Sequence, residues 1–300
     1  MNINVIGVPL FYGCDRKGVE NGPNILRENK LISILEKGKS NKVYDFGNLN
    51  VKNINSDEKF NSDSKMKYLS PIIDLNTNLA HAVYSSLKSD SFPLVIGGDH
   101  SLGMGSIAGA SKYFEDDLAV IWIDAHGDIN TEETSPSGNI HGMPLAASMN
   151  LGSKDLTNLY FNGRKVNPEK VFILCARDLD EGELKLIDKL NLNVWTTKTI
   201  KEKGIGTILS ELYKRLEEIK VNNIHLSFDI DCLDSSLVPG TGTPVENGMS
   251  LDEITYILKA VFETRKIKSM DFVEFNPEID TNNITLNNCL SLIKVISENI

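Results

Sequence analysis

The sequence has 300 residues, of which 41% are hydrophobic and 24% charged, as in an ordinary globular protein. A formal net charge of −10 without a local basic run argues against nucleic-acid binding, and no apolar stretch reaches the ~18 residues that a membrane span requires. Because the four cysteines form no CxxC pair and the N-terminus resembles a strand rather than a secretory leader, we expect a cytoplasmic protein without disulfides.

Short apolar runs alternate with longer amphipathic ones, which is the pattern of parallel βα units. Strands are predicted at 3–8, 43–47, 93–97, 119–124, 171–175, 192–196, 224–230 and 270–275. Helices are predicted at 22–37, 71–89, 103–114, 143–150, 181–190, 200–219, 252–265 and 285–298. The polar segment 50–68 is predicted to be a surface loop. We therefore expect one domain, 1–300, with three α/β/α layers and a largely parallel sheet of about eight strands.

Residues 118–141 join a strand of the buried type to a cluster of charged side chains. The apolar run 118–123 stops at Asp124, and Asp124, His126 and Asp128 follow at alternate positions. Alternate residues of an extended chain share one face about 6.6 Å apart, so we expect these three side chains to point to a common centre. Buried charges are costly unless they are paired, and a divalent cation is the simplest partner for this cluster.

Two other predicted strands end in similar residues. His100 follows one strand after a pair of glycines, which indicates a tight turn. Asp229 and Asp231 lie two positions apart at the end of another strand. Because the carboxyl ends of parallel strands are where open α/β sheets place their sites, the three clusters are expected to meet.

The combined set contains two imidazoles and four carboxylates. Its members are His100, Asp124, His126, Asp128, Asp229 and Asp231. Four carboxylates this close cannot all ionise without cations, and six ligands suit two ions that share bridging carboxylates, about 3.5–4 Å apart. The oxygen-rich set without a thiolate favours Mn²⁺ or a similar hard ion over structural zinc.

Several motifs together carry a family resemblance. They are GGDHS, DAHGD, SGNIHG, SFDIDCLD and PGTGTP, with IGVP and RKGVENGP near the N-terminus and CARDLDEGE and DFVEFNP further on. Together they resemble the ureohydrolase family, and within it the arginases, over nearly the whole chain. The resemblance implies that His100, Asp124, Asp128 and Asp229 hold one Mn²⁺ and that Asp124, His126, Asp229 and Asp231 hold the other.

The resemblance also implies a hydrolysis in which a hydroxide bridging the two ions attacks a guanidinium carbon. Asp128 would orient this hydroxide, and His141 would act as the acid/base that moves a proton near the leaving amine. Glu274 would pair with the guanidinium group, and Thr243 lies in the matching active-site loop. An imidazole suits the role of His141 because its pKa lies near neutral pH.

L-Arginine is the small-molecule substrate that the resemblance implies, with L-ornithine and urea as products. Asn130, Ser135 and Ser137 match positions that contact the α-carboxylate. Asp180 and Glu183 match positions near the α-amino group, and the assignment is stronger for Asp180 than for Glu183. Agmatine lacks the α-carboxylate, so these positions favour arginine.

Two alternatives stay open. The chain is an agmatinase or another guanidino-acid amidinohydrolase if the loop 130–139 does not approach the α-carbon end of the substrate. A catalytically silent relative is the second alternative, and the intact ligand set argues against it. Similar enzymes form trimers or hexamers, so a homo-oligomer is expected.

Four positions depart from the family pattern. Gly127 stands where Thr or Ala is usual, Glu181 and Ser235 each stand where Pro is usual, and Ser135 replaces a common Thr while keeping the hydroxyl. None of these changes removes a predicted ligand or acid/base group.

Overall fold

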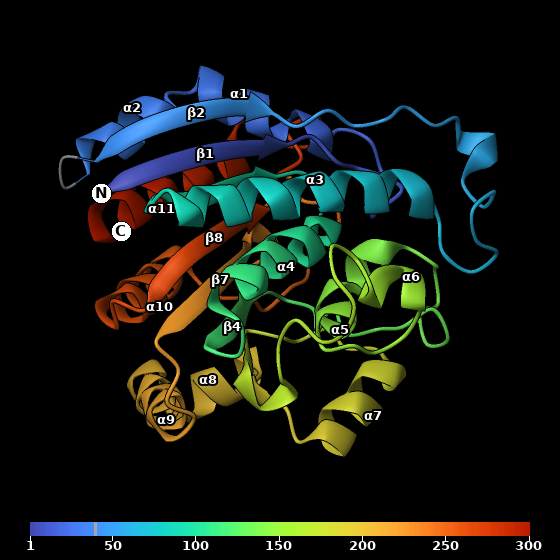
Figure 1. Cartoon of the computed structure of the whole chain (residues 1–300). Helices are drawn as coiled ribbons and strands as arrows, with labels where there is room; N and C mark the ends of the chain where they lie inside the picture. The colour runs from blue at the N-terminus through green and yellow to red at the C-terminus, as the bar shows by residue number, and fades with distance from the viewer. Residues whose placement is uncertain (39–40) are drawn as a thin grey trace.

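The computed structural model describes residues 1–38 and 41–300 (Figure 1). Its eight strands form one parallel sheet in the order β2-β1-β3-β8-β7-β4-β5-β6. The strands are β1 (Asn2–Val8), β2 (Lys42–Asn48), β3 (Phe92–Gly97), β4 (Leu118–Ile123), β5 (Val171–Leu174), β6 (Asn193–Trp195), β7 (Asn223–Asp229) and β8 (Ile267–Val273). All eight predicted strands and the parallel α/β/α fold class are confirmed.

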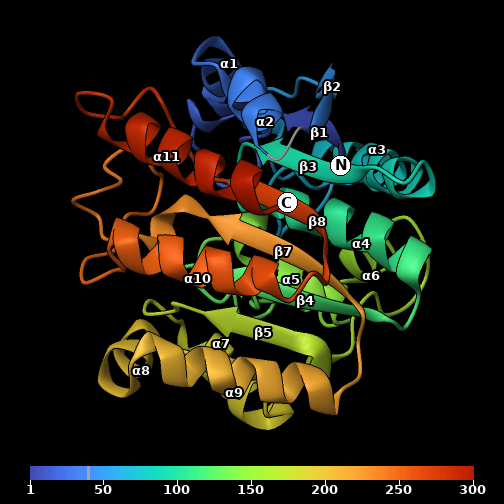
Figure 2. The ribbon, with the colours of Figure 1, turned by 90° about the vertical axis from the view of Figure 1, so that its left-hand side faces the viewer.

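Helices cover both faces of this sheet. One face carries α1 (Gly22–Glu28), α2 (Leu31–Lys37), α8 (Thr197–Lys203), α9 (Ile205–Glu218), α10 (Leu251–Glu263) and α11 (Ile284–Asn299). The other carries α3 (Leu69–Lys88), α4 (Gly103–Phe114), α5 (Pro144–Ser148), α6 (Lys154–Thr157) and α7 (Glu181–Leu190). Figure 2 looks onto the face that α8–α11 cover. No helix in the described ranges is long and apolar enough to cross a membrane.

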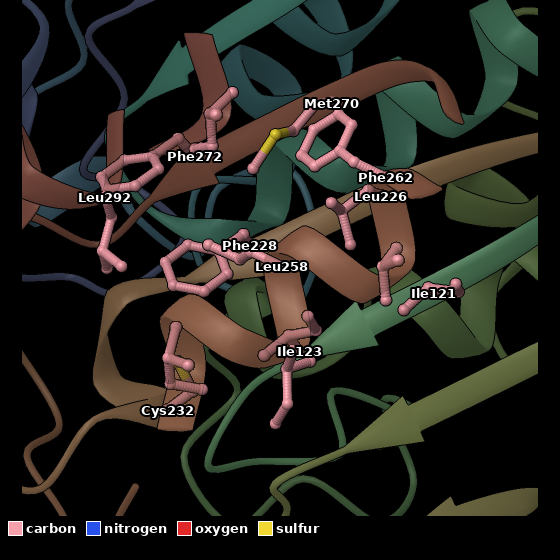
Figure 3. Packing of buried hydrophobic residues seen from close by; sticks show 14 of the residues in the cluster. Ile121, Ile123, Leu226, Phe228, Cys232, Leu258, Phe262, Met270, Phe272 and Leu292 are labelled. Atoms are coloured by element: carbon pink, nitrogen blue, oxygen red, sulfur yellow. The ribbon is translucent and has the colours of Figure 1, made fainter. Parts of the chain in front are cut away.

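The strands are apolar on both sides because both sides are covered. In β4, Ile121 and Ile123 belong to the core under α10, whereas Trp122 faces α5. Figure 3 shows Phe228 of β7 and Phe272 of β8 side by side under α10 and α11, with ring centroids 5.3 Å apart. This packing fixes the relative positions of the central strands, whose carboxyl ends carry the site.

Two predicted helices are each divided in two. The segment 22–37 breaks between α1 and α2, where Lys30 has a left-handed φ of 74°. The segment 200–219 breaks between α8 and α9 at Gly204, with a φ of 83°. A residue with a positive φ cannot continue a right-handed helix, so the prediction of single helices was wrong at both places. The short helix α6 was not predicted.

The prediction of an extended chain at the first cluster was also wrong. β4 ends at Ile123, and the chain bends through residues 124–126 instead of continuing as a strand. Asp128 adopts a left-handed φ of 51°. The three charged side chains therefore meet because the chain turns, not because alternate residues share a face.

The segment 50–68 is more than a solvated loop. Its first part is largely exposed, but Met66 is fully buried and Tyr68 is 4% exposed. Its last residues lie against the loop 130–139, as described below.

Candidate metal and catalytic site

The carboxyl ends of four adjacent strands, β3, β8, β7 and β4, bring the site together. His100 opens a 3-10 turn directly after β3, and Asp229 is the last residue of β7. Gly98 makes the turn at His100 possible, because a Cβ there would collide with the backbone carbonyl of Leu10. Asp99 fixes the same turn by accepting hydrogen bonds from the backbone N–H groups of Gly13 (2.9 Å) and Ser101 (3.0 Å).

The first ligand cluster surrounds His100. Its Nδ1 lies 3.0 Å from Asp124 Oδ2, 3.1 Å from Asp128 Oδ2 and 3.2 Å from Asp229 Oδ2. One ring nitrogen cannot satisfy three carboxylates, and this buried Nδ1 makes no well-aligned hydrogen bond. His100, Asp124 and Asp229 offer ligand atoms close enough together to hold one metal ion, and Asp128 Oδ2 lies beside them, so the donor set fits a cation.

The second cluster shares Asp124 with the first. His126 Nδ1 lies 3.1 Å from Asp231 Oδ2 and 3.3 Å from Asp124 Oδ1. Asp124, His126 and Asp231 can together hold a second ion, and each oxygen of Asp124 then faces a different cluster. The arrangement fits two metal ions with Asp124 between them.

The pKa values of the carboxylates in the two clusters also favour bound cations. Burial, reinforced by neighbouring carboxylates, raises the pKa of Asp229 and Asp231 and raises that of Asp128 to about 6. Burial also opposes ionisation of Asp124, yet the adjacent imidazoles of His100 and His126 hold its pKa below the usual value. Several buried carboxylates that resist ionisation together are the environment in which divalent cations are held.

His141 and Glu274 lie beside the clusters. Glu274 Oε1 accepts a hydrogen bond from the backbone N–H of His100 (2.9 Å) and lies 3.3 Å from His141 Nδ1. Glu274 Oε2 is buried and has no hydrogen-bond partner among the described residues. Burial lowers the pKa of His141, but the hydrogen bond to Glu274 and the charges of Glu274, Asp128 and Asp99 together raise the pKa above its ordinary value. The pair presents an imidazole and an unpaired carboxylate oxygen to the adjoining pocket.

This pocket gathers most of the residues that the sequence indicated. Its lining includes His100, His126, Asp128, Asn130, Ser135, Ser137, His141, Asp180, Glu183, Asp229, Thr243 and Glu274. Asp124 and Asp231 lie beneath it, with no exposed surface.

The loop 130–139 offers hydroxyl groups to the pocket. Ser135 Oγ accepts a hydrogen bond from the N–H of Gly138 (3.0 Å), and Ser137 Oγ accepts one from the N–H of Asn139 (3.1 Å). Both hydroxyl protons therefore stay available for an anionic ligand. Asn130 donates to Asp180 Oδ2 (2.8 Å), which joins this loop to the acidic side of the pocket.

Glu183 and Thr243 support the pocket wall. The two carboxylate oxygens of Glu183 accept hydrogen bonds from the N–H groups of Asp180 (2.9 Å) and Ile129 (3.1 Å), and burial raises its pKa to about 7. Thr243 donates to Asp231 Oδ2 (3.1 Å). Both side chains thus hold segments that carry other site residues.

The structure accounts for the departures from the family pattern. A Cβ at Gly127 would lie 2.8 Å from Glu183 Oε1, so glycine leaves room for that carboxylate. The N–H of Ser235 donates to the carbonyl of Val245 (3.2 Å), a bond that proline cannot make. Glu181 is an exposed residue in the first turn of α7 and pairs with Lys185.

Four further residues of the site were missed. Trp122 donates to Asp124 Oδ2 (3.0 Å) and stacks on His100 with ring centroids 3.9 Å apart. Ser227 lies 2.8 Å from His100 Nε2. Asn139 and Asp178 line the pocket. Each lies within one of the motifs that carry the family resemblance, or two residues before one. Proximity to these motifs could therefore have indicated all four.

Comparisons with known proteins agree with this geometry. The sequence matches the Arginase family over residues 1–296. The arginase of Staphylococcus aureus (strain COL) is 41% identical over 292 residues, covering 97% of this chain and 95% of that protein. The crystal structure of arginase from Bacillus subtilis subsp. subtilis str. 168 is similar with a TM-score of 0.91 and 38% identity, covering 99% of this chain and 98% of that chain. The structure of Entamoeba histolytica arginase in complex with L-ornithine has a TM-score of 0.85 and 33% identity, covering 99% of this chain and 97% of that chain. The chain therefore belongs to the arginase family.

Proposed function

We propose that this chain hydrolyses the guanidinium group of L-arginine to L-ornithine and urea. The observation that carries the proposal is the pair of ligand clusters sharing Asp124 beside the free carboxylate oxygen of Glu274. Relatives named arginase, about 40% identical over nearly the whole chain, support it. The Entamoeba histolytica relative holds L-ornithine, the expected product.

The metal centre that we propose contains two Mn²⁺ ions. The two clusters supply His100, Asp124 and Asp229 for one ion and Asp124, His126 and Asp231 for the other. Asp128, 3.1 Å from His100 Nδ1, would be a fourth ligand of the first ion, and Asp229 would also be a ligand of the second. Oxygen and imidazole donors without thiolate suit Mn²⁺. When bound, two dications lower the pKa of a water molecule so that it becomes a nucleophile near neutral pH.

The protein's own groups bind the guanidinium and move protons. Glu274 Oε2, buried and free, pairs with the guanidinium and holds its carbon beside the clusters. Asp128 accepts a hydrogen bond from the attacking water and so orients it. His141 keeps Nδ1 toward Glu274, which leaves Nε2 to deliver a proton to the departing amine.

The far end of the substrate meets the two sides of the pocket. Ser135 and Ser137 direct their hydroxyl protons to the α-carboxylate, with Asn130 beside them. Asp180 accepts from the α-ammonium, with Glu183 supporting it from below. Agmatine carries no carboxylate, so the hydroxyl groups of Ser135 and Ser137 would have no group of the substrate to bind.

Urea release from L-arginine and from agmatine tests this proposal, with metal-stripped protein reconstituted with Mn²⁺. We expect urea from arginine and little from agmatine, and an Asp128→Ala variant should stay folded while losing turnover. Urea from agmatine alone would contradict the assignment of the loop 130–139. Release from neither substrate, with two ions bound, would contradict arginine hydrolysis and favour another guanidino substrate or a silent relative.

We also propose that residues 1–300 act as one catalytic domain in the cytoplasm, as a homo-oligomer of three or six chains. Strands from the two ends of the sequence, β1 and β8, flank β3 in the same sheet, which supports one domain. All four cysteines are free thiols, as suits a reducing compartment. Light scattering on the purified protein would measure the oligomer mass.

A further inference from the structure

The end of the polar segment 50–68 lies directly against the loop that faces the substrate. The backbone N–H of Lys67 donates to the carbonyl of Gly138 (3.0 Å). Gly138 has a φ of 70°, and a Cβ there would collide with the carbonyl of Lys65. The two backbones are therefore in contact just before Asn139.

The side chain of Lys67 makes a second tether. Its Nζ donates to Asn139 Oδ1 (2.8 Å) and lies 3.1 Å from Asp15 Oδ2, and only 16% of the side chain is exposed. Asn139 in turn donates to the carbonyl of Cys14 (3.1 Å). Lys67 thus joins the segment 59–68, the opening loop and the pocket-lining Asn139 at one point.

The charged groups behind the loop 135–139 differ in sign from those on the opposite wall of the pocket. Lys59 Nζ lies 2.9 Å from the same Asp15 oxygen, so two ammonium groups surround one carboxylate behind the loop 135–139. The other side of the pocket presents Asp178 and Asp180. The α-carbon head of an amino acid carries a carboxylate and an ammonium group, which complement these two sides.

We propose that Lys67 is a specificity-determining positioning residue. It holds Asn139 and the loop 135–139 in place and supplies the excess positive charge behind them, so that the pocket selects guanidino substrates bearing an α-carboxylate. This inference rests on the proposed function and names the residue that distinguishes arginine from agmatine. Lys67 acts through Asn139 and does not itself touch the substrate.

Lys65 supplies a matched control. It lies two residues away and pairs with Glu133 at 2.6 Å, but both side chains are more than half exposed and neither lines the pocket. Lys65→Met and Lys67→Met remove the same charge from the same segment. Only Lys67→Met removes the tether to Asn139.

The experiment uses the Mn²⁺-loaded protein. For Lys67→Met we expect KM for L-arginine to rise on the order of tenfold, as for the loss of one charge-assisted contact, with kcat nearly unchanged. The kcat/KM for agmatine should stay at its wild-type value. Lys67→Arg should restore most of the arginine affinity, and Lys65→Met should leave both substrates unaffected.

Calorimetric binding of L-ornithine and putrescine gives a second readout that does not depend on turnover. Lys67→Met should weaken ornithine about tenfold and leave putrescine, which lacks the carboxylate, unchanged. If Lys67→Met fails to fold, Asn139→Ala removes the tether from the other end and should show the same selectivity.

Equal losses for both ligands, or equal effects of the Lys65 and Lys67 variants, would overturn this inference and leave a merely structural role. A wild-type protein that turns over arginine while Lys67→Met keeps its KM would overturn this inference alone. A loaded wild-type protein that binds neither ornithine nor putrescine would overturn it together with the proposed function.

Discussion

The protonation of His141 depends on nearby carboxylates, of which Glu274 contributes most. Burial alone would lower its pKa. The hydrogen bond to Glu274, 3.3 Å away, and the charges of Glu274, Asp128 and Asp99 together reverse this and raise the pKa above its ordinary value. Charged imidazole therefore persists to higher pH than in a free histidine. A step in which His141 donates a proton should lose rate only as the pH rises through this raised pKa.

Glu274→Gln removes that negative charge. We expect the pKa of His141 to fall, and the alkaline limb of the kcat profile to move to lower pH. Histidine NMR on Mg²⁺-loaded protein measures the pKa without paramagnetic broadening. Glu278→Gln, which changes an exposed carboxylate bonded to Asn21, is the control and should leave His141 unchanged. An identical titration in both variants would contradict the pairing.

At the scale of elements, Arg177 joins three loops at the carboxyl edge of the sheet. Its Nη2 donates to the carbonyls of Asp231 (2.8 Å), Leu233 (2.9 Å) and Val245 (2.9 Å). The segment after β5 is thereby held against the segments that carry Asp231 and Thr243. A planar guanidinium can contact several carbonyls at once, whereas an ammonium group cannot cover the same spread.

Arg177→Lys should therefore destabilise the fold although it conserves the charge. We expect a loss of about 2–4 kcal/mol in the free energy of unfolding, because several carbonyls lose their donors. Urea denaturation measures the loss. Arg215→Lys, on the exposed surface of α9 beside Glu218, should change it by less than about 0.5 kcal/mol. Equal stability of the two variants would mean that Arg177 does not hold these loops.

The sequence allowed the strands and the ligand clusters to be predicted because each cluster directly follows an apolar run. It did not reveal the helix break at Lys30, since lysine favours helices and only tertiary packing forces its left-handed φ. It also did not reveal the tether at Lys67, because a lysine-rich polar segment looks the same whether its side chains meet water or a neighbouring loop. Pairing between distant loops has no local signature.

At the scale of the whole molecule, the site places buried acids in an already acidic chain. Asp124, Asp128, Asp229 and Asp231 are each at most 6% exposed, and the formal net charge is −10. The pKa values of Asp128, Asp229 and Asp231 are raised, chiefly by burial. An acid whose pKa is higher in the folded state stabilises the fold at low pH, and this contribution is lost as the pH rises through the folded-state value.

Removal of metal should expose this dependence. After chelation we expect the melting temperature to fall between pH 6 and pH 8, whereas the Mn²⁺-loaded protein should melt at nearly the same temperature at both. At a metal concentration of about 100 Kd, each occupied site adds about 2.7 kcal/mol, or roughly 4 °C for a chain of this length. Asp124→Asn weakens the ligand shared by both clusters and should reduce the gain on adding Mn²⁺ at each pH. If calorimetry finds the same melting temperature with and without metal, other protein groups already stabilise these buried carboxylates and no metal ion is needed for it.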